Sequence, residues 1–161
     1  FLKAFNQIVR DKDKILNDCE TMLLALTNTD ELDKKVKNAQ SKYDDIQKLL
    51  ESYINENAHS KLDQKEYKAK YSNYLNIYEN EKSKFENLQN LKSERKTRAQ
   101  KIRDFVNQIK KSGEIITEFK DELFFATIEK ITVSSDKTAV FTFKNGIQIT
   151  MILFQIARNV I

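Results

Sequence analysis

The stretch that decides the fold is LDKKVKNAQSKYDDIQKLLESY, residues 32–53. Apolar and aromatic side chains recur in it at alternating steps of three and four residues, and polar residues fill most positions between them. A heptad of this kind lines up one apolar seam along a helix, and a second helix that packs against the seam buries it. The stretch therefore predicts one helix of a coiled coil. Its seam consists of Leu32, Val36, Ala39, Tyr43, Ile46, Leu50 and Tyr53.

A second and longer seam follows the polar link at residues 58–63. Asp63, with Glu66 three residues later, predicts the start of this helix, and Ser112-Gly113 predicts its end. At about 1.5 Å per residue the helix is roughly 70 Å long, whereas the helix before the link is only about 40 Å long. The short link predicts an antiparallel hairpin in which the first helix covers only half of the second. The second seam contains Tyr67, Tyr71, Tyr74, Tyr78, Phe85, Leu88, Ala99, Ile102, Val106 and Ile109.

The start of the chain carries the same spacing and predicts a helix over residues 1–27 that covers the rest of the long helix. The heptad phase breaks at residues 27–30, where Asn28 and Glu31 predict a capping box and a new helix. Folding the hairpin about its link places this break beside Lys92 and Arg95, which interrupt the long seam. Two interruptions at one level predict a joint. Its residues are Asn28, Asp30, Lys92 and Arg95.

After Gly113 the pattern changes from helical spacing to alternation. Residues 117–125 predict a short amphipathic helix, and the apolar residues between Ile131 and Ile149 alternate with period two. Turns are predicted at residues 135–137 and at Asn145-Gly146, which makes a three-stranded antiparallel β-meander. The predicted fold is mainly α: a helix at 1–27, a long antiparallel coiled-coil arm at 28–111 with its tip near 58–63, and a short helix with the β-meander at 114–152. Residues 153–161 form a tail without assignment.

Composition excludes several classes of function. The chain has 32% charged residues, two glycines, no proline, one cysteine and one histidine. It therefore lacks a glycine-rich phosphate loop, a histidine cluster and a zinc-binding cysteine set, and we expect neither a catalytic nor a metal site. Cys19 alone forms no internal disulfide, which is typical of a cytoplasmic protein. No apolar run approaches the roughly 20 residues of a membrane span, so no membrane contact is expected.

Three groups of residues carry a resemblance to a known family. The first runs from Leu16 to Leu26, and the second comprises Glu56–Ala58, Asp63–Tyr67, Tyr71 and Tyr78-Glu79. The third and most specific comprises Phe105, Thr117–Phe119, Leu123-Phe124, Ile128–Val133, Asp136 and Val140–Gly146. Together they resemble the C-terminal region of the large serine recombinases of low-GC bacteria and their conjugative transposons.

The resemblance implies a role in site-specific DNA recombination. Proteins of the family cut DNA with a serine in an N-terminal catalytic domain and read attachment sites through a recombinase domain and a zinc ribbon, into which the coiled coil is inserted. The catalytic domain and the zinc-binding cysteines are missing here, and because the chain starts at Phe1 we expect it to be part of a longer protein. Zinc is expected in the missing upstream ribbon. The implied partners are the coiled-coil arm of another protomer, a recombination directionality factor, and DNA through the adjoining domains. The implied location is the bacterial cytoplasm, at the nucleoid during recombination.

The arm's tip is the predicted partner-binding site, because apolar side chains at the end of a solvated arm suit contact with another protein. A role as hydrophobic plugs that close the seam remains open for Ile54 and Leu62, and His59 is also typical of an ordinary turn. The tip residues are Ile54, Ala58, His59, Leu62 and Tyr67.

A basic run on the long helix is the candidate for contacts with the DNA backbone, since lysine and arginine bind phosphate whatever the sequence. Glu94 and Asp104 interrupt the run, so a solvated helix face remains an alternative. Two other functions remain open for the whole chain: a nucleic-acid-binding arm, which needs an unbroken basic face, and a structural spacer, which needs a continuous seam. The basic residues are Lys96, Arg98, Lys101 and Arg103.

Overall fold

The computed structural model describes residues 1–60, 63–112 and 115–153. The chain divides into two compact units. Residues Asn28–Arg95 form one, which we name the hairpin unit; residues Phe1–Thr27 and Lys96–Ile161 form the other, which we name the mixed unit. Within the described residues the order of elements is four helices, a short fifth helix and three strands. The predicted fold class, mainly helical with a coiled-coil hairpin and a small C-terminal β-meander, is confirmed.

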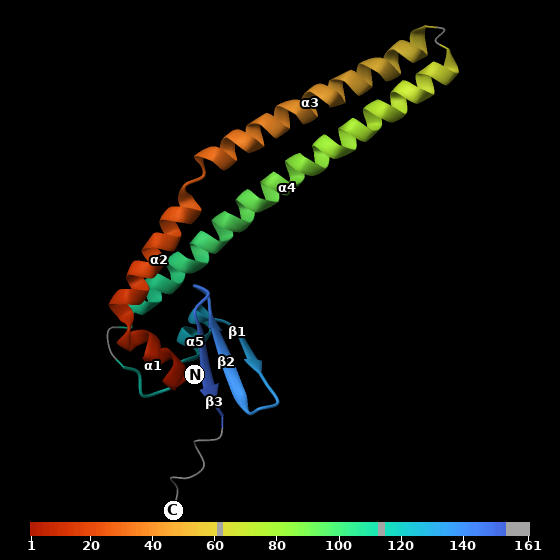
Figure 1. Cartoon of the computed structure of the whole chain (residues 1–161). Helices are drawn as coiled ribbons and strands as arrows, with labels where there is room; N and C mark the ends of the chain where they lie inside the picture. The colour runs from red at the N-terminus through yellow and green to blue at the C-terminus, as the bar shows by residue number, and fades with distance from the viewer. Residues whose placement is uncertain (61–62, 113–114, 154–161) are drawn as a thin grey trace, which may run out of the picture. The chain divides into compact units, whose positions relative to one another are not determined.

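The hairpin unit contains α3, Asp30–His59, and the first part of α4, Gln64–Lys111. Figure 1 shows these two segments running antiparallel beside each other. The buried residues of α3 are Leu32, Ala39, Ile46 and Leu50, which are members of the predicted seam. On the α4 side the seam is aromatic: Tyr78 lies 5.4 Å from Tyr43 between ring centroids, and their hydroxyl oxygens are 3.2 Å apart. The heptad pattern therefore identified the packed face of both helices.

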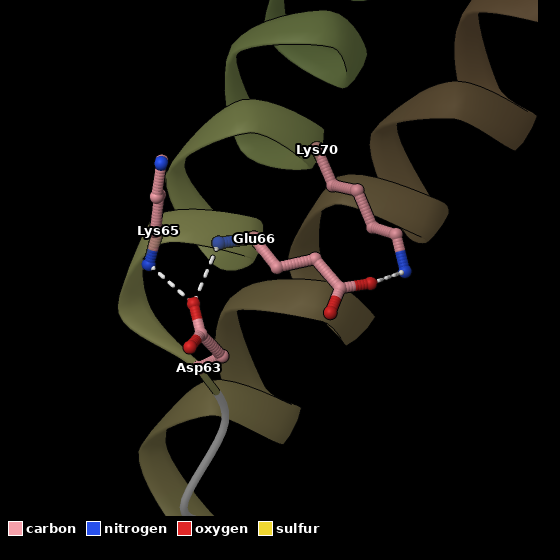
Figure 2. Close-up of polar contacts among 4 residues, drawn as sticks. All are labelled: Asp63, Lys65, Glu66 and Lys70. Carbon is pink, nitrogen blue, oxygen red and sulfur yellow. Dashed lines mark hydrogen bonds and ion pairs between the residues drawn. The ribbon is translucent and has the colours of Figure 1, made fainter.

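The start of α4 follows the prediction. One carboxylate oxygen of Asp63 accepts hydrogen bonds from the backbone amides of Lys65 and Glu66, at 2.8 and 3.0 Å (Figure 2). These amides have no hydrogen-bond acceptor inside the helix, so the carboxylate provides one. Its negative charge also interacts favourably with the positive end of the helix dipole.

The start of α3 differs from the predicted capping box. The helix begins at Asp30, and Thr29 occupies the cap position that we expected for Asn28. The Thr29 hydroxyl donates to the Asp33 carboxylate at 2.9 Å instead of accepting from the backbone. A threonine at the boundary competes with asparagine for the same role, and the sequence pattern alone did not decide between them.

The mixed unit contains α1, Leu2–Arg10, α2, Lys12–Thr27, the last part of α4 and α5, Asp121–Thr127. The single helix expected over residues 1–27 is therefore two helices, with the break at Asp11. The break lets α1 bury a face of its own, formed by Ala4, Phe5 and Ile8. The core that the unit shares consists of Ala4, Phe5, Ile8, Ile15, Cys19, Ile102, Phe105, Ile109, Leu123, Ile128, Ala139, Phe141, Phe143 and Ile149.

Three antiparallel strands complete the mixed unit, in the order β1, Ile128–Val133, β2, Thr138–Phe143, and β3, Gln148–Ile152 (Figure 1). Alternate residues of β2 are buried, as period two requires. The predicted turns are confirmed: Gly146 has φ 92° and its amide donates to Phe143 O at 2.8 Å. A positive φ is a conformation that glycine adopts without strain, which explains this residue at the turn.

Two side chains connect segments that are distant in the sequence. Asn6 holds Ile116 with both groups of its amide: Nδ2 donates to the backbone oxygen at 2.8 Å, and Oδ1 accepts from the backbone amide at 2.9 Å. Asn145 is 2% exposed, accepts from the Ile147 amide at 3.1 Å, and donates to Cys19 Sγ at 3.6 Å. The short helix, expected at residues 117–125, spans Asp121–Thr127 and so begins later than expected.

Candidate protein-binding site at the end of the hairpin

The structure gives the predicted tip residues different environments. Ile54 is 44% exposed, and Ala58 and His59 are also exposed at the end of α3. Tyr67 is half-buried, so it belongs to the seam as well as to the tip. Leu62 lies outside the described residues. Of the predicted set, Ile54 is therefore the large apolar side chain that the structure shows available to a partner.

The end of the hairpin is closed by aromatic rings. Tyr53 of α3 stacks on Tyr67 of α4 at a centroid distance of 5.1 Å and meets Tyr74 edge to face at 5.3 Å. Tyr67 in turn stacks on Tyr71 at 5.9 Å. Aromatic pairs at such distances attract each other beyond their area burial. The rings close the seam, which reduces the need for Ile54 as a plug.

A groove lies beside this stack, between α3 and α4. It has a volume of about 330 Å³ and is open to solvent. Its walls include the rings of Tyr53, Tyr67 and Tyr74 and the aliphatic side chain of Leu49, which is 45% exposed. Sequence reasoning missed this groove, although Leu49 directly precedes the seam residue Leu50 and interrupts an otherwise polar flank.

Charged side chains border the groove. Lys70 Nζ lies 2.7 Å from a carboxylate oxygen of Glu66 (Figure 2). This hydrogen bond and the carboxylate charge raise the pKa of Lys70, so the ammonium is retained. Glu56 and Asp63 also line the groove. The groove thus presents an aromatic wall, an exposed leucine, three carboxylates and one lysine that is paired with Glu66.

The residues of the predicted joint lie near the other end of the hairpin unit. Lys92 Nζ lies 2.6 Å from an Asp33 carboxylate oxygen, which agrees with the predicted register of residues 27–30 beside residues 91–94. The hydrogen bond from Lys92, together with the one from Thr29, lowers the pKa of Asp33. Arg95 is half-buried, whereas Asp30 and Asn28 are exposed. Whether these residues form a hinge stays a prediction.

The candidate DNA-contacting residues lie on the part of α4 that belongs to the mixed unit. Lys101 pairs with Glu129 at 2.7 Å, while Lys96, Arg98 and Arg103 are exposed. The charge of the chain is unevenly divided. Residues 28–95 contain 13 lysines and arginines and 13 aspartates and glutamates, so the net charge of +4 is carried by the rest of the chain.

Within the described ranges, no group of three or more histidine, cysteine, aspartate and glutamate residues is placed to hold a metal ion. The same residues contain no helix with the length and hydropathy needed to span a membrane. Cys19 is buried, and burial raises the pKa of its thiol although the Asn145 hydrogen bond opposes the shift.

No protein-family model matches the chain, and no curated protein or solved structure matches it either. Its relationship to the large serine recombinases therefore rests on the resemblance between residues and stays a prediction.

Proposed function

We propose that this chain is the non-catalytic coiled-coil region of a large serine recombinase and that the end of its arm binds the arm of another protomer during synapsis. The observation that carries the proposal is Ile54, which is 44% exposed at the end of a hairpin whose seam is already closed by tyrosines. Because Tyr53 and Tyr67 already close the seam, this side chain is available to a partner. A directionality factor that redirects the arms would control which arm ends meet.

The charge distribution supports protein contact over nucleic-acid contact for the arm. Affinity for nucleic acid comes mainly from cationic side chains that neutralise phosphates. The hairpin unit has no excess of these, because its sequence contains 13 cationic and 13 anionic residues. The excess of +4 in the rest of the chain favours the mixed unit, with Lys96, Arg98 and Arg103, for any contact with the DNA backbone. We expect the isolated chain to bind duplex DNA weakly, to lose that binding as salt rises, and not to cleave it.

A small contact between arm ends must be weak on its own. Interfaces that bury less than about 1,200 Å² are typically transient. DNA-bound domains that hold two arms near each other raise their effective concentration and make such a contact sufficient. This explains how a weak contact can select the assembled complex.

The test replaces Ile54 by aspartate in the full-length recombinase. We expect helical content and binding to single attachment sites to stay normal, because Ile54 is exposed at a hairpin end, while stable synaptic complexes are lost. The matched control is Gln40→Asp, which adds the same charge at an exposed position of α3 far from the tip. Normal synapsis by a folded Ile54→Asp variant, measured by gel shift with paired sites, contradicts the proposal.

A further inference from the structure

The two edges of the β-sheet differ in how they are protected. β1 and β3 are the outer strands of the order β1-β2-β3 (Figure 1). β1 carries the charged residues Glu129 and Lys130, and its pairing with β2 is interrupted between Ile128 and Lys130. Charges and bulges are common means by which proteins keep an edge strand from pairing with another chain. β3 has no charged residue, and its register with β2 is continuous, so it lacks both protections.

The backbone of β3 has hydrogen-bonding groups that point away from β2. In an antiparallel pair, residues that bond the neighbouring strand alternate with residues whose amide and carbonyl groups point outward. Ile147, just before β3, and Leu153, just after it, both form backbone hydrogen bonds on the β2 side, each with an N···O distance of 2.8 Å. By alternation, the backbone groups of Gln148, Thr150 and Ile152 face the open edge. No other strand within the described residues pairs with that edge.

An apolar hollow of about 630 Å³ opens beside this edge. Thr150 and Ile152 of β3 line it, together with the rings of Phe119 and Phe141 and the side chain of Leu153. Ile152 is 61% exposed and Phe119 is 53% exposed. Ligand pockets typically have volumes of about 300–1,000 Å³ and are lined mainly by apolar side chains. The edge therefore offers backbone hydrogen bonds and, next to them, space for the apolar side chains of a strand that pairs with it.

A second hollow, of about 470 Å³, adjoins the first and is cationic. The two hollows share Lys3 and Met151, and Arg10 lines the second. Lys3 and Arg10 are seven residues apart on α1, so they lie on one face of the helix, about 10 Å apart along its axis. Both are exposed, and no ion pair joins either of them to another described residue. Among the described residues, no aspartate or glutamate lines either hollow.

We propose that an extended, acidic segment of a partner protein pairs with the open edge of β3 as a fourth strand, with apolar side chains in the hollow and carboxylates near Lys3 and Arg10. In this mode of recognition, main-chain hydrogen bonds provide affinity and pockets for alternate side chains provide specificity. A second copy of β3 fits less well, because its neutral sequence brings no counter-ion for the two cations. A basic strand would meet like charges. This surface goes beyond the proposed function, which concerns the end of the hairpin.

The experiment measures the binding of two peptides to the complete chain by fluorescence anisotropy. Both are labelled peptides of about ten residues, the upper length of an ordinary strand. One alternates valine with glutamate and the other alternates valine with lysine, so they share the apolar residue and differ in charge. We expect the glutamate peptide to bind at least about tenfold more tightly. Equal affinities would overturn the inference, as would no binding of the glutamate peptide at chain concentrations up to about 1 mM.

Thr150→Pro tests the backbone pairing. The Thr150 amide points to the open edge, so proline removes a donor that the partner strand needs but no hydrogen bond to β2. The matched control is Val133→Pro. Because Ser134 bonds Thr138, the alternation places the Val133 amide on the outer edge of β1. We expect Thr150→Pro to weaken binding of the glutamate peptide by about tenfold or more and Val133→Pro to leave it unchanged. Unchanged binding by Thr150→Pro would overturn the strand pairing.

A charge exchange keeps the test decisive if proline disturbs the sheet. Lys3→Glu should weaken binding of the glutamate peptide and strengthen binding of the lysine peptide, a reversal that loss of folding does not produce. Lys14→Glu makes the same change at an exposed position of α2 outside both hollows and should leave the preference as it is. An unaltered preference in Lys3→Glu would overturn the inference. Self-association of the parent chain that Thr150→Pro abolishes would also overturn it, because the edge would then belong to a second copy.

Discussion

Replacing Asn145 by alanine should destabilise the mixed unit, because this side chain joins the β2–β3 turn to α2. Asn145 is 2% exposed and makes two hydrogen bonds: its oxygen accepts from the Ile147 amide at 3.1 Å, and its nitrogen donates to Cys19 Sγ at 3.6 Å. Cys19 precedes it by 126 residues, so the contact exists only in the folded unit.

The magnitude follows from these contacts. A hydrogen bond between amide groups contributes about 1 kcal/mol net, and leaving its partner unsatisfied costs about 1–3 kcal/mol. The bond to sulfur is weaker and adds little. Asn145→Ala should therefore lower the free energy of unfolding by about 2–3 kcal/mol.

A second substitution, Asn145→Asp, separates the loss of the hydrogen bonds from burial of a charge. It retains the acceptor for the Ile147 amide but places a carboxyl group in a site that excludes water, so burial should raise the pKa of that group above the unfolded value of about 3.9. A raised folded pKa means that the variant is closest to the parent below the unfolded pKa and loses stability as the pH rises toward the folded pKa. The aspartate variant should thus be less stable at pH 7 than at pH 4, relative to the parent at each pH.

Urea denaturation followed by circular dichroism at pH 4 and pH 7 measures both effects. Asn107→Asp, at an exposed position of α4 in the same unit, is the control for a surface charge and should follow the parent at both values. The reasoning is refuted if Asn145→Asp has the same deficit at pH 4 and pH 7, or if Asn145→Ala is as stable as the parent.

Three further predictions concern the core of the mixed unit and the predicted joint. Phe105 is fully buried and meets Phe143 edge to face at 6.1 Å, so Phe105→Ala should cost about 3–5 kcal/mol in urea denaturation; the exposed control Phe125→Ala should cost less than about 0.5 kcal/mol, and equal costs would contradict the assigned core. The pKa of Asp33 is lowered chiefly by its hydrogen bond from Lys92, so the stability that the carboxylate contributes is present above the unfolded-state pKa and is lost as the pH falls through the folded-state pKa. The melting temperatures of the parent and Asp33→Asn should therefore converge in acid. A difference in melting temperature that does not change with pH would exclude this linkage. Arg95→Leu should raise the melting temperature by extending the seam, whereas Lys92→Leu should lower it by removing the cation that pairs with Asp33, which then keeps only its hydrogen bond from Thr29. The same sign for both would show that the ion pair is irrelevant there.

The seams of α3 and α4 could be predicted from the sequence because a repeat of seven residues within each helix specifies which side chains pack. The same holds for the turn at Asn145-Gly146, where two residues specify the backbone. The break at Asp11 could not be predicted in this way. The heptad spacing continues across it, and the direction of α1 depends on the distant core that receives Phe5 and Ile8.

The groove at the end of the hairpin lay beyond the sequence for a similar reason. The sequence identifies Tyr67 and Tyr74 as seam residues, but the groove beside them depends on the axial register between α3 and α4. Leu49 was the available indication, because a leucine beside the seam position Leu50 has no role in the heptad. Lys70 and Glu56 lie on different helices, and only the packing of α3 against α4 brings them to the same groove.

The way the chain is divided also has a consequence for how the protein is made. All residues of the hairpin unit are consecutive, Asn28–Arg95, whereas the mixed unit joins Phe1–Thr27 to Lys96–Ile161. During synthesis the hairpin can form as soon as Arg95 has left the ribosome, because the unit consists of consecutive residues that have all been translated by then. Phe5, Ile8 and Cys19 must wait until the strands that bury them have been translated. A pulse of limited proteolysis on nascent chains should find the arm protected first and the N-terminal helices last.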